Sequence, residues 1–446
     1  MANVEFSNYS PPQESGLTPK SLRITLCFDG TMNNKNNTDA RRANTETFQD
    51  HDDDASYEND YSNVARLWDV TTDHRIYVEG VGTEDGKGDS LIGGATGSFS
   101  RGIRAKIRKG CEEVAKYVKS QLGSDEILDQ LTIDVFGFSR GAATARNFTY
   151  EISKAAYKAR PNVNGGMVTH YTDSDRKIVS SENLPEGGLL GYFFEQQKLK
   201  FRNWANVKVG LLGVYDTVSS YSGETLIPNF SNDVRELSLN SLAKAKHIVH
   251  FTAENEFRKN FALTRVNRGV EKAFPGVHCD IGGAYENGPE LVTIERSYLS
   301  KSSLEPIRER LLREGWYDEE ELQIKKKGFG AYYNLVGDKN YVHKEYSYVL
   351  LHFMQEYFIK YKGEGSIETV ESKYSIDTHK DLKTFKDKVK NYALNLENTS
   401  PLSFSDQMSM DNKSLLWELR KNYLHRSAKA KIGMGPANKQ WTRGIY

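Results

Sequence analysis

The residues most able to do chemistry are a five-residue segment, GFSRG, at positions 137–141. The segment fits the pattern G-x-S-x-G, and it follows an apolar run at 131–136 and precedes a stretch with helical periodicity. In that context Ser139 lies on a sharp strand-to-helix turn, and Gly137 and Gly141 leave room for the turn. The pattern predicts a nucleophilic serine. The alternative is a structural glycine turn with a capping serine.

A serine hydroxyl is a poor nucleophile without a base, so an acid and a histidine should follow it in the chain. Asp216 ends the apolar run VKVGLLGVYD, and His278 lies in the glycine-framed segment PGVHCDIGGAY. The order Ser, Asp, His is that of the α/β-hydrolase fold. We therefore expect Asp216 to be the acid and His278, in a loop, to be the base. An Asx turn or helix cap is the alternative for Asp216.

Acyl transfer also requires backbone N–H groups that stabilise the developing oxyanion. The N–H of Arg140, directly after the serine, is one candidate. The second is expected in the loop that follows the first strand, at Gly30 or Thr31, because glycine lets the main chain approach a substrate closely. We expect Asp29, next to that loop, to pair with the Arg140 side chain and so support the turn that carries Ser139.

The elements that must position these residues alternate along the chain. Apolar, β-branched runs are followed by glycine turns and then by helical patterns, which favours a parallel sheet. Strands apolar on both faces indicate that helices cover both sides. We predict an α/β fold, an α/β-hydrolase-like, mostly parallel sheet with cap insertions and a C-terminal helical addition. Strands are expected at 22–28, 74–79, 131–136, 207–215 and 247–252.

Composition shifts divide the chain. Residues 1–20 are polar and predict a flexible N-terminal arm. A catalytic domain is expected over 21–290, with insertions at about 33–60 and 161–205. From 291 to 446 the pattern changes to long charged helical segments. We expect this helical region to form a cap or to contact a membrane.

Two further segments suggest membrane contact. The apolar stretch 189–194 after Gly187-Gly188 is a candidate mobile lip over an acyl groove, with a buried helix as the alternative. Basic residues at helical spacing near 101–109 could meet anionic headgroups, although a solvent-exposed helix face explains them equally well. The acidic run 50–54 lacks the glycine and glutamate of an EF-hand loop, so a solvated loop is favoured over a calcium site.

Overall composition excludes several classes of protein. The 446 residues include 60 Lys+Arg and 60 Asp+Glu, so charge gives no reason to expect a nucleic-acid partner. Three widely spaced cysteines encode neither a disulfide framework nor a Cys-rich zinc site. The glycine-rich segment 80–88 misses the spacing of a phosphate-binding loop. We expect no cofactor and no metal. The N-terminal segment lacks the apolar run of a signal peptide, which predicts synthesis in the cytoplasm.

Six ordered segments resemble the α/β-hydrolase-like family that includes the first family of bacterial type VI secretion lipase effectors. They are LCFDGTMNN, YVEGVGT, DVFGFSRGAATARNF, GVYDTV, AENEFRKNF and PGVHCDIGGAY. The similarity covers about residues 22–285, with weaker similarity in LHRSA and WTRGIY. It implies that Ser139 is the nucleophile, Asp216 the acid and His278 the base. One departure is Asn255-Glu256, where the family often has Asp-Glu.

The resemblance also implies a biological setting. It implies a phospholipase of A1 or A2 type that acts on membrane phospholipids as an antibacterial toxin. A type VI spike or tube component would carry it into the periplasm of a rival cell, and the producer would hold a cognate immunity protein. Two alternatives remain open, a cytosolic serine esterase or thioesterase with a small acyl substrate, and a non-catalytic α/β-hydrolase-like binding module.

Overall fold

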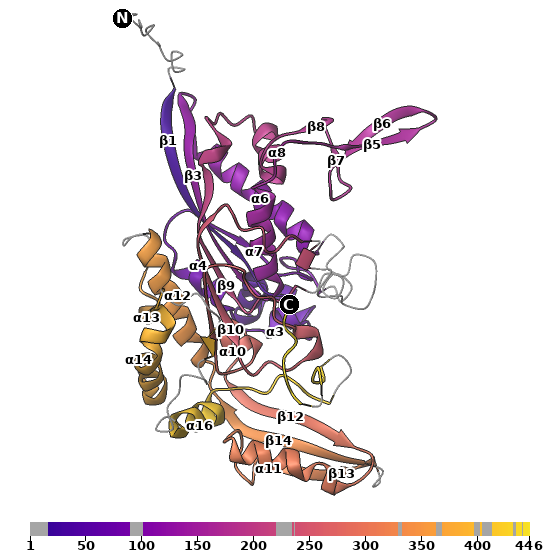
Figure 1. The fold of residues 1–446 in the computed structure, drawn as a ribbon, viewed down its shortest axis with the longest axis vertical. Coiled ribbons are helices and arrows are strands. Elements are labelled where there is room, and N and C mark those ends of the chain that lie inside the picture. Colours follow the sequence, from indigo (N-terminus) through magenta and orange to yellow (C-terminus); the bar gives the residue numbers. More distant parts are fainter. Residues whose placement is uncertain are drawn as a thin grey trace, which may run out of the picture.

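A seven-stranded sheet lies at the centre of the computed structural model (Figure 1). Its strand order is β15-β11-β10-β9-β3-β1-β2, and every pairing among these strands is parallel. The predicted α/β-hydrolase-like fold is confirmed. The strands are β1 (Thr18–Phe28), β2 (Arg75–Val78), β3 (Glu126–Phe138), β9 (Val207–Tyr215), β10 (Ala245–Ala253), β11 (Val270–Phe274) and β15 (Leu402–Ser403). The structure describes residues 17–89, 101–219, 234–235, 237–328, 332–362, 368–396, 402–403, 413–430, 434–438 and 440–446.

Helices cover both faces of the sheet because successive side chains of each strand enter different cores. In β1, Cys27 lies in the core with α4 and α12, whereas Leu26 lies in the core with α6, α7 and α8. Both faces are therefore buried, as a parallel sheet requires. The helices of the first face are α4 (Asn63–Val70), α12 (Tyr346–Lys362) and α14 (Lys380–Leu394). Those of the second are α6 (Ile103–Gln121), α7 (Arg140–Glu151) and α8 (Gly188–Gln196).

The C-terminal region is not wholly helical, so that expectation for 291–446 is wrong in part. A three-stranded antiparallel sheet, in the order β12-β14-β13, lies at one end of the molecule with α11 (Glu305–Arg313) (Figure 1). One of its strands, β13, has the sequence LQIKKK, and its three lysines are exposed. Those charges hide the strand pattern. The strands are β12 (Gly288–Ser297), β13 (Leu322–Lys327) and β14 (Tyr332–Val342).

The excursions from the sheet take different forms. Segment 33–60 forms three short helices, α1 (Lys35–Arg42), α2 (Glu46–Gln49) and α3 (Ala55–Glu58). Segment 161–205 contains most of a small antiparallel sheet that projects from the body, and also α8 (Figure 1). Leu189, Leu190 and Phe194 of α8 are fully buried against the core, so the expected mobile lip is a buried helix. The projecting strands are β5 (Arg160–Asn164), β6 (Met167–Thr172) and β7 (Ile178–Val179).

Basic residues at the start of α6 form ion pairs within the protein. Arg104 pairs with Glu151 and Asp175, and Lys109 pairs with Glu79. Their charges are neutralised within the protein. These residues are therefore neither free to contact lipid headgroups nor part of an unpaired, solvent-exposed helix face. No helix among the described residues is apolar over a length that would span a bilayer. The N-terminal arm expected at 1–20 lies largely outside the described residues, and β1 already includes Thr18.

Candidate active site

Ser139 lies on a strained turn between β3 and α7. Its backbone has φ 59°, in the left-handed region that residues other than glycine rarely adopt. Close packing explains the two glycines: a Cβ on Gly137 would lie 2.5 Å from the Gly141 carbonyl oxygen, and one on Gly141 would lie 2.2 Å from the Asp29 carbonyl oxygen. Only glycine fits at these two positions. The turn presents Ser139 at the carboxyl end of β3, as a nucleophile elbow requires.

Asp216 and His278 are brought together by neighbouring elements. Asp216 directly follows β9, and its Oδ2 lies 2.6 Å from Nδ1 of His278. His278 is the first residue of the short helix α10 (His278–Gly282), so the expected loop position is wrong. The imidazole is buried between two aromatic rings, with centroid distances of 4.6 Å to Phe138 and 5.0 Å to Phe261. Because Phe138 precedes Ser139, this packing holds the imidazole beside the turn.

Arg443 is a partner of Asp216 that the sequence analysis did not identify. Its two terminal nitrogens lie 2.7 Å from Oδ1 and 2.8 Å from Oδ2 of the Asp216 carboxylate. The guanidinium also donates to the carbonyl oxygens of Ala253 and Phe261. A fork of this kind fixes the plane of a carboxylate as well as its charge.

These contacts set the protonation states of the pair. Burial alone would raise the pKa of Asp216, but Arg443 and the hydrogen bond with His278 hold that pKa well below its usual range. Burial lowers the pKa of His278, although Asp216 acts in the opposite direction. The imidazole is thus neutral at neutral pH with Asp216 ionised beside it. That is the resting state of a general base with an orienting acid.

A second buried carboxylate, Glu256, supports the backbone of the histidine. Its Oε2 accepts a hydrogen bond from the His278 N–H at 3.3 Å. The Arg258 guanidinium and the Ser427 hydroxyl donate to the same carboxylate. Burial would raise the pKa of Glu256, but Arg258 above all lowers it to about 2. Glu256 is fully buried and ionised, with Arg258 two residues away in the chain and Ser427 171 residues away.

Asp280 and His425 form a further buried pair next to α10. Asp280 Oδ1 lies 2.7 Å from Nδ1 of His425, and Asp280 Oδ2 accepts the backbone N–H of Val277 at 2.9 Å. The His425 ring stacks on Tyr285 at 3.8 Å. His425 therefore holds the helix that carries His278.

The predicted pairing of Asp29 with Arg140 does not occur. Asp29 accepts hydrogen bonds from the Ser62 and Tyr77 hydroxyls and from the Gly30 N–H. Arg140 instead donates its Nε to the Thr31 hydroxyl at 2.5 Å. Asp29 still supports the elbow, because its main-chain carbonyl lies against Gly141. Its carboxylate fixes the loop after β1.

The same contacts narrow the choice of oxyanion donors. The Gly30 N–H is already occupied by Asp29 Oδ1 at 2.7 Å, so it is not available to a substrate. Within the described residues, the N–H groups of Thr31 and Arg140 have no hydrogen-bond partner. The Arg140 N–H begins α7, where the helix dipole favours negative charge. Thr31 and Arg140 are thus the better placed pair of donors.

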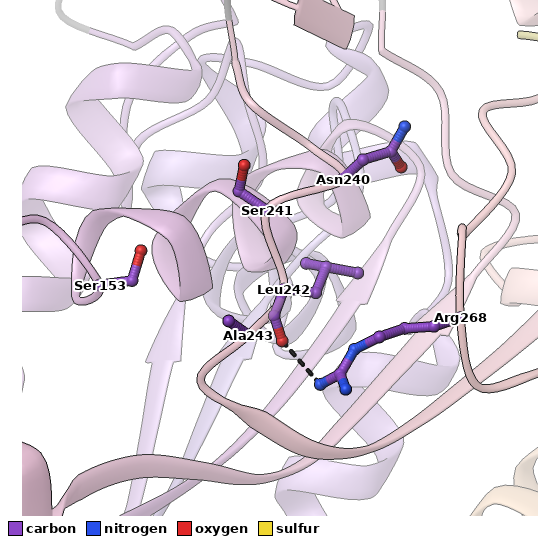
Figure 2. A pocket seen from close by; sticks show the side chains of 6 residues that line it. All are labelled: Ser153, Asn240, Ser241, Leu242, Ala243 and Arg268. Carbon is purple, nitrogen blue, oxygen red and sulfur yellow. Dashed lines mark hydrogen bonds between the residues drawn. The ribbon is translucent and has the colours of Figure 1, made fainter.

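A pocket elsewhere in the structure has a volume of about 420 Å³. Figure 2 shows the side chains that line it. One wall is formed by Arg268, which donates to the Leu242 carbonyl at 2.8 Å. None of Ser139, Asp216 and His278 lines the pocket, and none belongs to a group with metal-ligand spacing among the described residues. The pocket is lined by Ser153, Asn240, Ser241, Leu242, Ala243 and Arg268.

Comparison with known proteins places this site in a family. Residues 22–306 match the family model described as "T6SS, Phospholipase effector Tle1-like, catalytic domain". The chain belongs to this Tle1-like family. The predicted resemblance to type VI lipase effectors is therefore confirmed, and membership indicates an ester hydrolase that is exported by a type VI secretion system. The matched range contains the GFSRG segment, Asp216 and His278, but ends before Arg443.

One solved structure extends the likeness of this Tle1-like protein to its fold. That structure, described as the "Structure of the Tle1 effector bound to the VgrG spike from the Type 6 secretion system", has a TM-score of 0.58 at 18% identity. The alignment covers 100% of this chain and 98% of that one. An uncharacterized protein from Pseudomonas aeruginosa has a TM-score of 0.32 at 19% identity, over 60% of this chain and 42% of that one. No curated protein matches the chain.

Proposed function

We propose that this Tle1-like protein is a serine phospholipase A that uses Ser139, His278 and Asp216. The observation that carries the proposal is the 2.6 Å hydrogen bond between Asp216 and His278, with the imidazole packed on the residue before Ser139. A base oriented by a buried acid, beside a serine on a strained turn, is the arrangement that activates a hydroxyl.

The reaction then has two halves. His278 takes the proton of the Ser139 hydroxyl while the oxygen attacks the ester carbonyl of the lipid. The N–H groups of Thr31 and Arg140 stabilise the oxyanion of the tetrahedral intermediate. Its collapse releases the lysolipid, whose alcohol oxygen takes the proton from His278, and leaves an acyl group on Ser139. Water, deprotonated by His278, hydrolyses the acyl ester and frees the fatty acid.

Arg140 supports a phospholipid rather than an uncharged ester as substrate. Among the described residues its guanidinium has no carboxylate partner, and its Nε contact with Thr31 holds it beside the proposed oxyanion loop. Burial lowers the pKa of Arg140 to about 10, so it remains charged at neutral pH. A cation with a free fork next to the nucleophile suits the phosphate of a headgroup.

The delivery route is part of the same proposal. The solved Tle1 effector is described as bound to the VgrG spike, which supports a spike component as the carrier of this chain. A phospholipase made in the producer's cytoplasm would require a cognate immunity protein for self-protection. We propose the periplasmic face of a rival's membrane as the place of action.

The test is lipid hydrolysis by pure protein. Wild type and Ser139→Ala are incubated with phosphatidylethanolamine–phosphatidylglycerol vesicles, and the products are identified by mass spectrometry. We expect free fatty acid and lysolipid from the wild type only. Lipids with different chains at the two positions distinguish A1 from A2 cleavage. Activity on short soluble esters without vesicle hydrolysis would favour a small-molecule esterase, and no labelling by a fluorophosphonate would favour a binding module.

The role of Arg140 is tested by comparing a phospholipid with an uncharged ester as substrate. Arg140→Gln should reduce hydrolysis of phospholipid about tenfold or more relative to an uncharged ester with the same acyl chain, because charge-assisted hydrogen bonds contribute about 1.5–3 kcal/mol. Arg140→Lys keeps the charge and should retain part of the preference. Equal losses on both substrates would show that Arg140 acts on the turn rather than on the phosphate.

A further inference from the structure

Three side chains with metal-binding chemistry meet away from the candidate triad. His343 and Glu345 lie between β14 and α12, and His379 directly precedes α14. One ligand atom from each lies within 4.8 Å of the other two. Glu345 Oε2 is 3.7 Å from Nδ1 of His343 and 3.9 Å from Nε2 of His379. The carboxylate oxygen thus lies between two imidazole nitrogens.

These distances are too long for hydrogen bonds and suit ligands of one ion. With metal–ligand bonds of about 2.1 Å, neighbouring ligand atoms of a tetrahedral site lie about 3.4 Å apart. Shifts of a few tenths of an ångström would bring Glu345 into that range with each histidine. Glu345 Oε2 is also buried and accepts no hydrogen bond. A buried oxygen without a partner is costly, and a cation would satisfy it.

The remaining polar atoms of Glu345 and His379 have contacts that hold them in place. Glu345 Oε1 accepts a hydrogen bond from the Asn287 side chain at 2.9 Å. His379 Nδ1 lies 3.3 Å from the Tyr423 hydroxyl, which leaves Nε2 facing Glu345. Such outer contacts orient ligands in metal sites. Lys344 does not oppose a cation, since Asp60 and Glu286 pair with its ammonium group.

We propose that His343, Glu345 and His379 bind one divalent transition-metal ion of the Zn²⁺ type. Two imidazoles and one carboxylate match Zn²⁺, whereas Ca²⁺ and Mg²⁺ prefer oxygen ligands throughout. Three protein ligands leave the fourth position of a tetrahedron for water. His343 and Glu345 are two residues apart, and His379 comes from a separate segment 34 residues further along the chain.

The ion would connect the C-terminal helices to the segment around His278. Tyr346, next to Glu345, donates its hydroxyl to the Pro275 carbonyl at 2.7 Å, three residues before His278. Asn287, the partner of Glu345, follows α10 and also accepts the Lys344 N–H through its side-chain oxygen. The site would stabilise this junction and take no part in the reaction itself.

The test measures binding directly. Full-length protein is stripped with a chelator and titrated with ZnCl₂ by calorimetry, and bound metal is counted by elemental analysis. We expect one Zn²⁺ per chain and a rise in melting temperature, because a ligand of the native state stabilises it. Ca²⁺ at the same concentration should do neither. A wild type that binds no Zn²⁺, or one that responds equally to Ca²⁺, overturns the proposal.

Variants locate the ion. His379→Ala and Glu345→Gln should weaken Zn²⁺ binding more than about 100-fold, since loss of an outer contact alone costs 10–100-fold. His170→Ala, on the projecting sheet, should leave it unchanged and serves as the matched control. A His379→Ala protein with full affinity contradicts the site. Should the variants fail to fold, Co²⁺ titration of the wild type must show intense tetrahedral d–d bands. Ser139→Ala should bind Zn²⁺ normally, which separates this proposal from the phospholipase reaction.

Discussion

Arg443 places its two terminal nitrogens on the two carboxylate oxygens of Asp216, at 2.7 and 2.8 Å, from 227 residues further along the chain. The fork leaves Oδ2 of Asp216 facing His278 and keeps the carboxylate ionised in a fully buried position. Arg443 is therefore a positioning residue for the candidate base. It contacts Asp216 directly and holds the backbone of Phe261, whose ring packs on His278.

Removal of Arg443 should damage both stability and activity. In Arg443→Ala the buried Asp216 charge loses its main partner, and breaking a buried pair in this way costs about 3–5 kcal/mol. We expect a loss of that order in the free energy of unfolding, measured by urea denaturation. We also expect a marked fall in kcat/KM on vesicles and a changed pH profile, because the pKa of Asp216 rises.

Two substitutions make this result interpretable. Arg443→Lys restores the charge without the fork, so an intermediate kcat/KM is expected. Arg313→Ala removes an exposed arginine from α11 and should change neither the free energy of unfolding nor kcat/KM. An Arg443→Ala protein with a wild-type pH profile would contradict a positioning role.

Gly141 should not tolerate even one added methyl group. A Cβ at this position would lie 2.2 Å from the Asp29 carbonyl oxygen and 2.4 Å from that of Phe28. Backbone atoms cannot move aside as a flexible side chain can, so Gly141→Ala should cost at least about 1–3 kcal/mol. Thermal unfolding measures the effect. Gly435→Ala, where nothing lies within 4 Å of the added carbon, is the control. Equal melting temperatures would show that the elbow can relax.

The pH dependence of hydrolysis should report on His278. Burial lowers the pKa of its imidazole, so the neutral form that acts as base persists below the ordinary value of 6.5. We expect kcat/KM to stay constant down to that pH and to decline only in more acidic solution. Initial rates on vesicles across the pH range measure the acidic decline of kcat/KM. NMR titration of Ser139→Ala measures the pKa of His278 without turnover. An apparent pKa above 6.5 would disprove this assignment.

Stability should fall in acid through Glu256 and Asp216. The pKa of Glu256 is lowered from 4.5 to about 2, and that of Asp216 is also lowered. A carboxyl group with a depressed folded pKa stabilises the protein fully above its unfolded pKa and loses that contribution as pH falls through the folded value. The melting temperature should therefore decrease between pH 4.5 and about pH 2. Glu256→Gln should show a shallower decrease, and an identical slope would refute the role of Glu256.

The parts of the fold that local patterns encode could be predicted from the sequence. The elbow at Ser139 needs only a strand, two glycines and a helix in succession, all of which are visible in a short window. Asp216 and His278 follow strands, so their meeting at one sheet edge could be expected. The strand β13 could not be distinguished from a charged helix, because its six residues end in three exposed lysines.

The support of the site could not be predicted because it is non-local. The C-terminal segment brings Arg443 to Asp216, Ser427 to Glu256 and His425 to Asp280 of α10, and no periodicity or spacing links these residues in the sequence. The one available signal was the similarity of LHRSA and WTRGIY to the family, since these strings contain all three residues. The Asp29–Arg140 pairing was predicted wrongly because Ser62 and Tyr77, which satisfy Asp29, come from other segments.

The contact between Arg443 and Asp216 also bears on when the site is assembled during synthesis. The ribosome releases the elbow and Asp216 long before residue 443, and His425 and Ser427 also emerge late. Until then Asp216 has no guanidinium partner, and α10 lacks two of its supports. Translation order thus delays assembly of the proposed membrane-degrading centre inside the cell that makes it, so a nascent chain stalled before residue 443 carries an incomplete site.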